Sequence, residues 1–149
     1  MGQVLERLRP RLRTFRDEAG RELFDVLDGP MPDPDTPAPV RFFPTYDNIY
    51  LSHKDRARIM DEHASWTTAP SQFNAIFRSG SFAVDGFVVG GWRLERDAKA
   101  GRATVVAIPL VPLAVAARRD VQAEAIALAE FLAPELSDRD VRFDARPSP

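Results

Sequence analysis

Alternating apolar and polar positions in the second half of the chain give its clearest structural signal. Residues 82–84 and 87–89 are apolar runs separated by residues 85–86, Asp-Gly, which is the signature of a β-hairpin with a two-residue turn. The glycine pair at 90–91 predicts a bulge or bend in the second strand. Residues 103–110, ATVVAIPL, predict a buried third strand that ends at its proline. Three consecutive strands of this kind predict an antiparallel meander.

The spacing changes to that of a helix at residues 113–132. Apolar residues recur there every three or four positions, charged residues lie largely elsewhere, and Pro134 stops the helix. The apolar face comprises Val115, Val121, Ala125, Leu128 and Leu132. Residues 140–143, DVRF, predict one more short strand. The pattern therefore predicts one long helix packed across a sheet.

The first part of the chain predicts a separate arm. Residues 4–12 have helical spacing, and Pro10 should cut that helix short. Two short apolar runs, at 12–15 and 22–26, flank a polar loop that ends in Gly20, and such a glycine supplies the positive φ that a hairpin turn needs. A helix followed by a basic hairpin is the order in which a winged helix ends. An ordinary solvated helix and hairpin would give the same pattern.

Prolines mark the connection that follows. At residues 28–39 proline alternates with acidic or small residues, which predicts a semi-rigid extended linker. We therefore expect a helix and wing-like hairpin at 1–27, a proline-rich linker at 28–40 and a β-rich domain at 41–149.

Residues 41–60, RFFPTYDNIYLSHKDRARIM, form the stretch around which the rest of the chain is arranged. Tyr46, Ile49 and Leu51 predict a hydrophobic anchor in the core. Residues 47–48, Asp-Asn, predict a turn or a helix cap, because both side chains can accept from a backbone N–H a few positions ahead.

The second half of the same stretch is cationic. Lys54, Arg56 and Arg58 alternate along the chain, so in an extended segment they would face the same way. His53 either caps or packs beside Asp55, or it joins these cations in holding a DNA backbone. The stretch thus predicts an anchor followed by a basic edge.

Charge and composition narrow the range of functions. The net charge is −2 and the pI is near 5.7, which argues against strong DNA binding by the isolated chain, because such affinity comes from neutralising phosphates. The charge is uneven, however. Residues 1–21 hold six arginines against three acidic residues, which predicts a basic arm on an acidic body.

Several classes of site are not expected. The chain has no cysteine and only two histidines, so we expect neither a disulfide, a metal nor another cofactor. It contains no apolar run of membrane-spanning length and no signal-peptide pattern, so we expect no membrane partner and a cytoplasmic location. The carboxylate pairs Asp33/Asp35 and Asp61/Glu62 lie in the proline-rich linker and on a polar edge, surroundings that do not favour acid–base catalysis.

Three segments resemble a known family. The pattern from Phe42 to Arg56, F-x-P-x-Y-D-N-I-Y-L-S-H-K-D-R, resembles the central motif of the bacterial AlkZ-like (YcaQ-like) winged-helix group, which includes DNA glycosylases. Residues 13–28, RTFRDEAGRELFDVLD, and 84–95, VDGFVVGGWRLE, match in the same order. The resemblance covers most of the chain and corresponds to the C-terminal portion of such proteins.

The resemblance also limits what this chain does alone. Glycosylases of the group use a catalytic motif, Gln-apolar-Gln or Gln-apolar-Asp, in their N-terminal part. Gln3, Gln72 and Gln122 are not followed two residues later by Gln or Asp, so no catalytic residue can be carried over and we do not expect an enzyme in this chain alone.

The sequence therefore predicts an α+β fold: an antiparallel meander curled toward a small barrel, one long packed helix, and an N-terminal helix and hairpin left from a winged helix. The first hypothesis is a DNA-binding accessory module. Its predicted contacts to duplex backbone are Arg11, Arg13, Arg16, His53, Lys54, Arg56 and Arg58. The alternative is a structural or protein-interaction domain that docks, through the N-terminal arm, on a partner supplying the missing winged helices, or that self-associates there.

Overall fold

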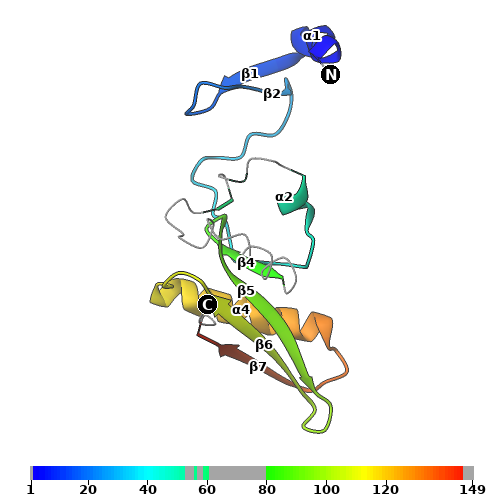
Figure 1. The fold of residues 1–149 in the computed structure, drawn as a ribbon, viewed down its shortest axis with the longest axis vertical. Helices are drawn as coiled ribbons and strands as arrows, with labels where there is room; N and C mark the ends of the chain where they lie inside the picture. Colours follow the sequence, from blue (N-terminus) through cyan, green and yellow to red (C-terminus); the bar gives the residue numbers. More distant parts are fainter. Residues whose placement is uncertain (1, 53–55, 57–58, 61–79, 146–149) are drawn as a thin grey trace. The chain divides into compact units, whose positions relative to one another are not determined.

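The computed structural model describes residues 2–52, 56, 59–60 and 80–145. The chain divides into two compact units, Met1–Thr36 and Pro37–Pro149. The division falls between Thr36 and Pro37, inside the proline-rich stretch. Figure 1 shows the fold of each unit and labels most of its helices and strands.

The first unit is a helix followed by a hairpin. Helix α1 (Gly2–Leu8) passes into a 3₁₀ turn, η1 (Arg9–Arg11), at the position where Pro10 removes a backbone donor. Strands β1 (Leu12–Arg16) and β2 (Glu22–Val26) pair antiparallel. Gly20 in the connecting loop has φ +77°. The helix and the hairpin predicted from the sequence are both confirmed.

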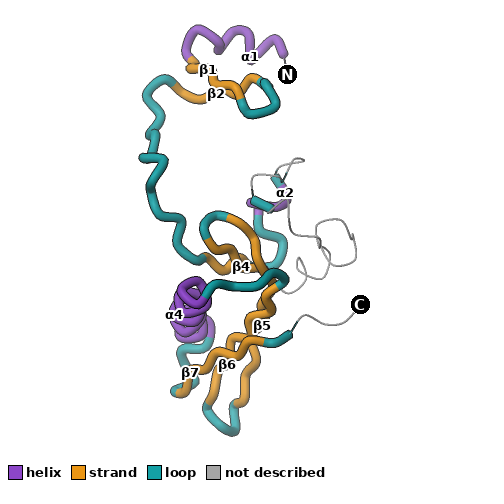
Figure 2. The backbone as a smooth tube through the Cα atoms, turned by 90° about the vertical axis from the view of Figure 1, so that its left-hand side faces the viewer, coloured by secondary structure: helices purple, strands orange, loops and turns teal. Residues whose placement is uncertain are grey.

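In the described residues, the second unit comprises a five-stranded sheet and one long helix. Its strands are β3 (Arg41–Phe43), β4 (Ser81–Val84), β5 (Phe87–Asp97), β6 (Arg102–Pro109) and β7 (Asp138–Phe143), in the spatial order β3-β4-β5-β6-β7. The helices among the described residues of this unit are α2 (Asn48–Leu51) and α4 (Val115–Leu132). Figure 2 shows α4 lying along one face of the sheet. The α+β fold class is confirmed.

One prediction about the sheet is wrong. We predicted an antiparallel sheet, but β7 pairs parallel to β6, with Val105 opposite Val141. The reason is the long connection. Helix α4 carries the chain back to the end of the sheet where β6 begins, and such a crossover joins parallel strands. The described strands form an open sheet whose edges are β3 and β7.

The hairpin formed by β4 and β5 has the turn and the bulge that the sequence predicts. Asp85 and Gly86 both have positive φ, +52° and +79°, which is the backbone of a type I′ turn. The predicted bulge is present: Phe82 pairs with Gly90 and Ala83 with Val88, so β5 carries an extra residue there. A Cβ on Gly90 would lie 2.3 Å from the Phe82 ring, so glycine allows this ring to pack against the strand.

The core lies between α4 and the sheet. Val121, Ala125 and Ala129 of the helix are completely buried, and the last two belong to one cluster with Ala103 and Val105 of β6. Val115 was predicted on the same face but is 88% exposed. It is the first residue of α4, and the part of the helix that meets the sheet begins later.

Candidate nucleic-acid interface

Three of the six arginines in the first unit, Arg9, Arg13 and Arg21, are bound by carboxylates of the same unit. The Arg9 guanidinium donates to both oxygens of Glu22 at 3.0 Å and to Glu6 at 3.2 Å, and it lies 5.0 Å from the centre of the Phe24 ring. The contact with Arg9 lowers the pKa of Glu22 below its ordinary value. Arg21 similarly holds Asp17 across the turn, at 2.6 Å. These cations stabilise the fold of the arm.

Arg13, a predicted DNA contact, is also engaged. Its guanidinium donates to Asp25 Oδ2 at 2.8 Å and to the carbonyl oxygen of Gly29 at 2.7 Å. The side chain is only 24% exposed, and it lies over the Phe15 ring. The bond from Arg13 lowers the pKa of the Asp25 carboxyl. Arg13 therefore ties β1 to the start of the linker.

Arg11 and Arg16 remain exposed. In the described part of the chain neither makes an ion pair, and the only hydrogen bond from the Arg16 side chain is a long one, 3.4 Å, to the carbonyl oxygen of Gly20. Arg7, in the last turn of α1, is also exposed, although it is not among the DNA contacts predicted from the sequence. Glu6 and Arg9 stand three residues apart at the predicted helix, a spacing that could have indicated that these two side chains pair with each other and leave Arg7 exposed.

The second predicted cationic group is only partly visible. His53, Lys54 and Arg58 lie outside the described residues. Arg56 is half-buried, and its carbonyl oxygen accepts from the backbone N–H groups of Ile59 and Met60 at 3.0 and 3.1 Å. Because the two cationic groups belong to separate units, a common basic surface stays a prediction.

The turn between β3 and α2 is fixed at both ends. The indole N–H of Trp92 donates to the carbonyl oxygen of Phe43 at 2.9 Å. Four residues later, the Asp47 carboxylate accepts from the backbone N–H of Ile49 at 2.8 Å, and Ile49 packs against the cluster around Met60. The predicted cap at Asp47 is thus confirmed, and so is the packing of Ile49.

Tyr46, predicted as part of the same anchor, does not lie in the core. Its side chain is 65% exposed, and its φ is +59°. The left-handed backbone at Tyr46 reverses the chain before the α2 cap and turns the side chain outward. Sequence spacing assumes regular local structure, so it could not show this.

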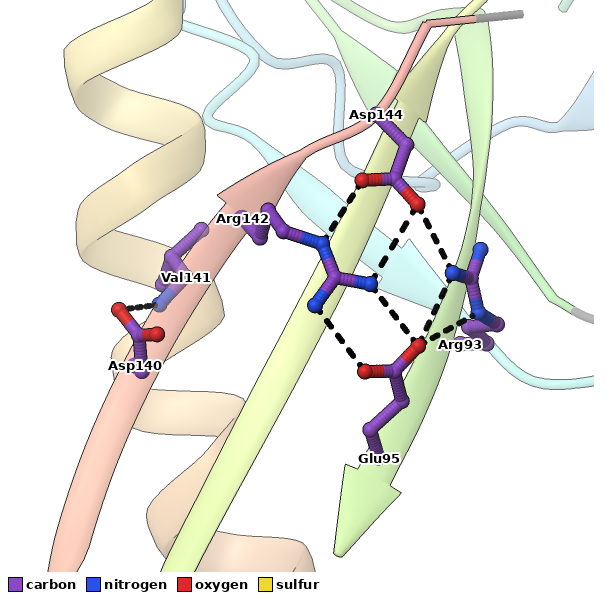
Figure 3. A network of polar contacts seen from close by, with 6 residues as sticks. All are labelled: Arg93, Glu95, Asp140, Val141, Arg142 and Asp144. Atoms are coloured by element: carbon purple, nitrogen blue, oxygen red, sulfur yellow. Dashed lines mark hydrogen bonds and ion pairs between the residues drawn. The ribbon is translucent and has the colours of Figure 1, made fainter.

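A neutral ionic network occupies the face of the sheet opposite α4. Arg93 and Arg142 each bond both Glu95 and Asp144, at 2.8 to 3.1 Å, as Figure 3 shows. Val106 lies between the two arginines in register, so the three side chains share one face, and Val106 is completely buried. The two positive and two negative charges cancel, so this network offers little attraction to phosphate.

Among the described residues, no cluster of histidines and carboxylates could hold a metal ion. In the same part of the chain, no helix combines the length and apolar character needed to span a bilayer.

Comparisons with known proteins place the chain in a family. The family described as DNA glycosylase AlkZ-like matches residues 1–131. No curated protein matches the chain. Among solved structures, the DNA glycosylase AlkZ of Streptomyces sahachiroi is similar in fold, with a TM-score of 0.62 and 20% sequence identity over 94% of this chain. The chain spans 35% of the length of that protein. With a family match over most of its residues, the chain belongs to the AlkZ-like DNA glycosylase family.

Proposed function

We propose that this chain is a DNA-binding accessory module in DNA repair, which contacts the backbone of duplex DNA without itself cleaving a glycosidic bond. Membership of the AlkZ-like family supports a role on DNA. We propose no catalytic role, because none of the three glutamines, Gln3, Gln72 and Gln122, stands in the Gln motif of the group.

The observation that carries this proposal is the exposure of Arg11 and Arg16. They are cations of the hairpin arm that form no ion pair within the described residues, although the charge of Arg16 helps to lower the pKa of Glu22, which lies opposite it in the hairpin. Cations of this kind bind phosphates and position a protein on DNA without reading its sequence. Arg13 has the different role of holding the arm in shape. His53, Lys54, Arg56 and Arg58 form a second group of proposed backbone contacts.

A variant series tests the assignment. We expect Arg11→Ala plus Arg16→Ala to weaken binding to a fluorescein-labelled 20-base-pair duplex and to lower the salt slope by about two, roughly one for each phosphate contact removed. The control is Lys99→Ala plus Arg119→Ala, which removes the same charge from exposed sites of the second unit. Equal losses in both double variants would mean that net charge alone matters and would refute the assignment to the arm.

A second function is favoured by the apolar surface of the arm. Of the ten large hydrophobic residues that are exposed in the described part of the chain, six lie in the first unit, although it has only 36 residues. They are Val4, Leu8, Phe15, Val26, Leu27 and Met31. Exposed apolar residues gathered on so small a unit are typical of an interaction surface. The proposed partner is a polypeptide that carries the remaining winged helices of the AlkZ-like architecture.

Light scattering after size exclusion distinguishes the occupants of this surface. If a second copy covers it, the mass rises with concentration and Val4→Ser plus Leu8→Ser restores the monomer. If a separate polypeptide covers it, the chain stays monomeric alone and binds that polypeptide in a manner that the same double variant abolishes. A monomeric chain whose binding is insensitive to these substitutions would contradict the interaction role.

A further inference from the structure

Tyr46 is exposed on a turn that the fold fixes at both ends. Its side chain is 65% exposed and makes no hydrogen bond or ring contact with any described residue. The carbonyl oxygen of Phe43, three residues earlier, is held by Trp92, and the backbone of Ile49, three residues later, is held by Asp47. An exposed aromatic ring on so firmly held a turn loses little conformational entropy when it binds a ligand.

The backbone at Tyr46 has a positive φ, which is unusual for a residue other than glycine. Asp85 and Tyr46 are the two non-glycine residues with positive φ in the described part of the chain. Asp85 belongs to a type I′ hairpin turn, where Asp is a favoured residue. Tyr46 has no such reason, because a bulky side chain with positive φ is rare and costly. Strained conformations of this kind concentrate at functional sites.

Packing around the turn shows how the fold maintains it. Gly80 has φ +87°, and a Cβ there would lie 2.5 Å from Nε1 of Trp92 and 2.9 Å from the carbonyl oxygen of Phe43. Glycine at this position therefore leaves room for the bond between Trp92 and Phe43. Phe42 packs edge-to-face on Trp92, with ring centroids 5.8 Å apart, and places the indole. Gly80, Trp92 and Phe42 together therefore hold the turn on which Tyr46 is exposed.

We propose that Tyr46 is a stacking platform for an unpaired nucleobase. This inference rests on the DNA-binding role proposed above and adds a substrate class, DNA with at least one base outside the duplex stack. Aromatic side chains bind such bases through their π-faces with little sequence preference.

Two single strands test the inference with the full chain. One is a 12-nucleotide oligothymidylate, and the other is an abasic strand of equal length with the same phosphates but without bases. We expect the natural chain to bind the oligothymidylate about 5- to 150-fold more tightly than the abasic strand, the range expected for one stacked base. Tyr46→Phe retains the preference, because the ring remains. Tyr46→Asn loses it, and Asn is among the residues that best tolerate positive φ, so that variant keeps its fold.

The outcomes separate this inference from the proposed function. Equal binding of the two strands by the natural chain overturns the stacking platform and leaves the backbone-binding role intact. A base preference that survives in Tyr46→Asn overturns the assignment to Tyr46. Absence of binding to either strand and to duplex DNA overturns both. Fluorescence of 2-aminopurine placed in the strand provides an independent readout, because stacking on Tyr46 quenches it and Tyr46→Asn restores it.

Discussion

Replacing Gly80 with alanine should loosen the turn that presents Tyr46. The added Cβ would lie 2.5 Å from Nε1 of Trp92, so the indole must move and its bond to the Phe43 carbonyl oxygen breaks. An alanine at φ +87° costs about 1–2 kcal/mol, and the lost hydrogen bond costs about 0.5–1.5 kcal/mol. We therefore expect Gly80→Ala to lower the free energy of unfolding by about 2–3 kcal/mol.

A double-mutant cycle tests this reasoning without relying on the absolute value. Trp92→Phe already lacks Nε1 and the hydrogen bond, so adding Gly80→Ala to it should cost about 1 kcal/mol less than it does in the natural chain. Urea denaturation followed by far-UV circular dichroism measures all four proteins without depending on tryptophan fluorescence. Strictly additive costs would refute the contact between Gly80 and the Trp92 bond as the cause.

The remaining predictions concern the ionic network and the core. Arg142 and Arg93 hold the pKa of Asp144 at about 2, below its ordinary value of 3.8, so the stability from this carboxylate is present above pH 4 and is lost as pH falls from 4 to 2. Thermal melts of Asp144→Asn should therefore show a weaker loss in that range, and an unchanged acid profile would contradict the pairing. Phe82→Ala removes a completely buried ring and should cost about 3–5 kcal/mol in urea denaturation. Its control, Phe131→Ala, alters a side chain that is 80% exposed and should cost less than about 0.5 kcal/mol; similar costs for both would contradict the core as described.

Local signals in the sequence predicted the local parts of the fold. The turn at Asp85-Gly86 was predictable because both residues accept positive φ and apolar runs flank them. The helix was predictable from residue spacing, but its contact face was not, because periodicity does not show where the helix meets the sheet. Val115 continues the apolar spacing and is nevertheless exposed.

At the candidate site, the structure differs from the sequence prediction where contacts join residues that are far apart in the chain. The pair between Arg13 and Asp25 depends on the register of the hairpin, in which these residues are directly opposite each other. The predicted turn could have indicated this register. The prediction from the sequence instead took every arginine of the arm as free to bind phosphate. The parallel pairing of β7 had a usable signal, since a long helix between two adjacent strands favours a crossover. The positive φ of Tyr46 had no signal in the residue pattern.

The most direct test of the central claim is a salt titration of duplex binding by the natural chain. If Arg11 and Arg16 each neutralise one phosphate, the logarithm of the association constant falls with the logarithm of salt concentration with a slope of about two or more, because each contact contributes about 0.9. We predict this slope, with binding that is strongest at the lowest salt. A chain that fails to bind duplex DNA even at about 10 mM salt, where the Debye length reaches about 30 Å, would contradict the DNA-binding role.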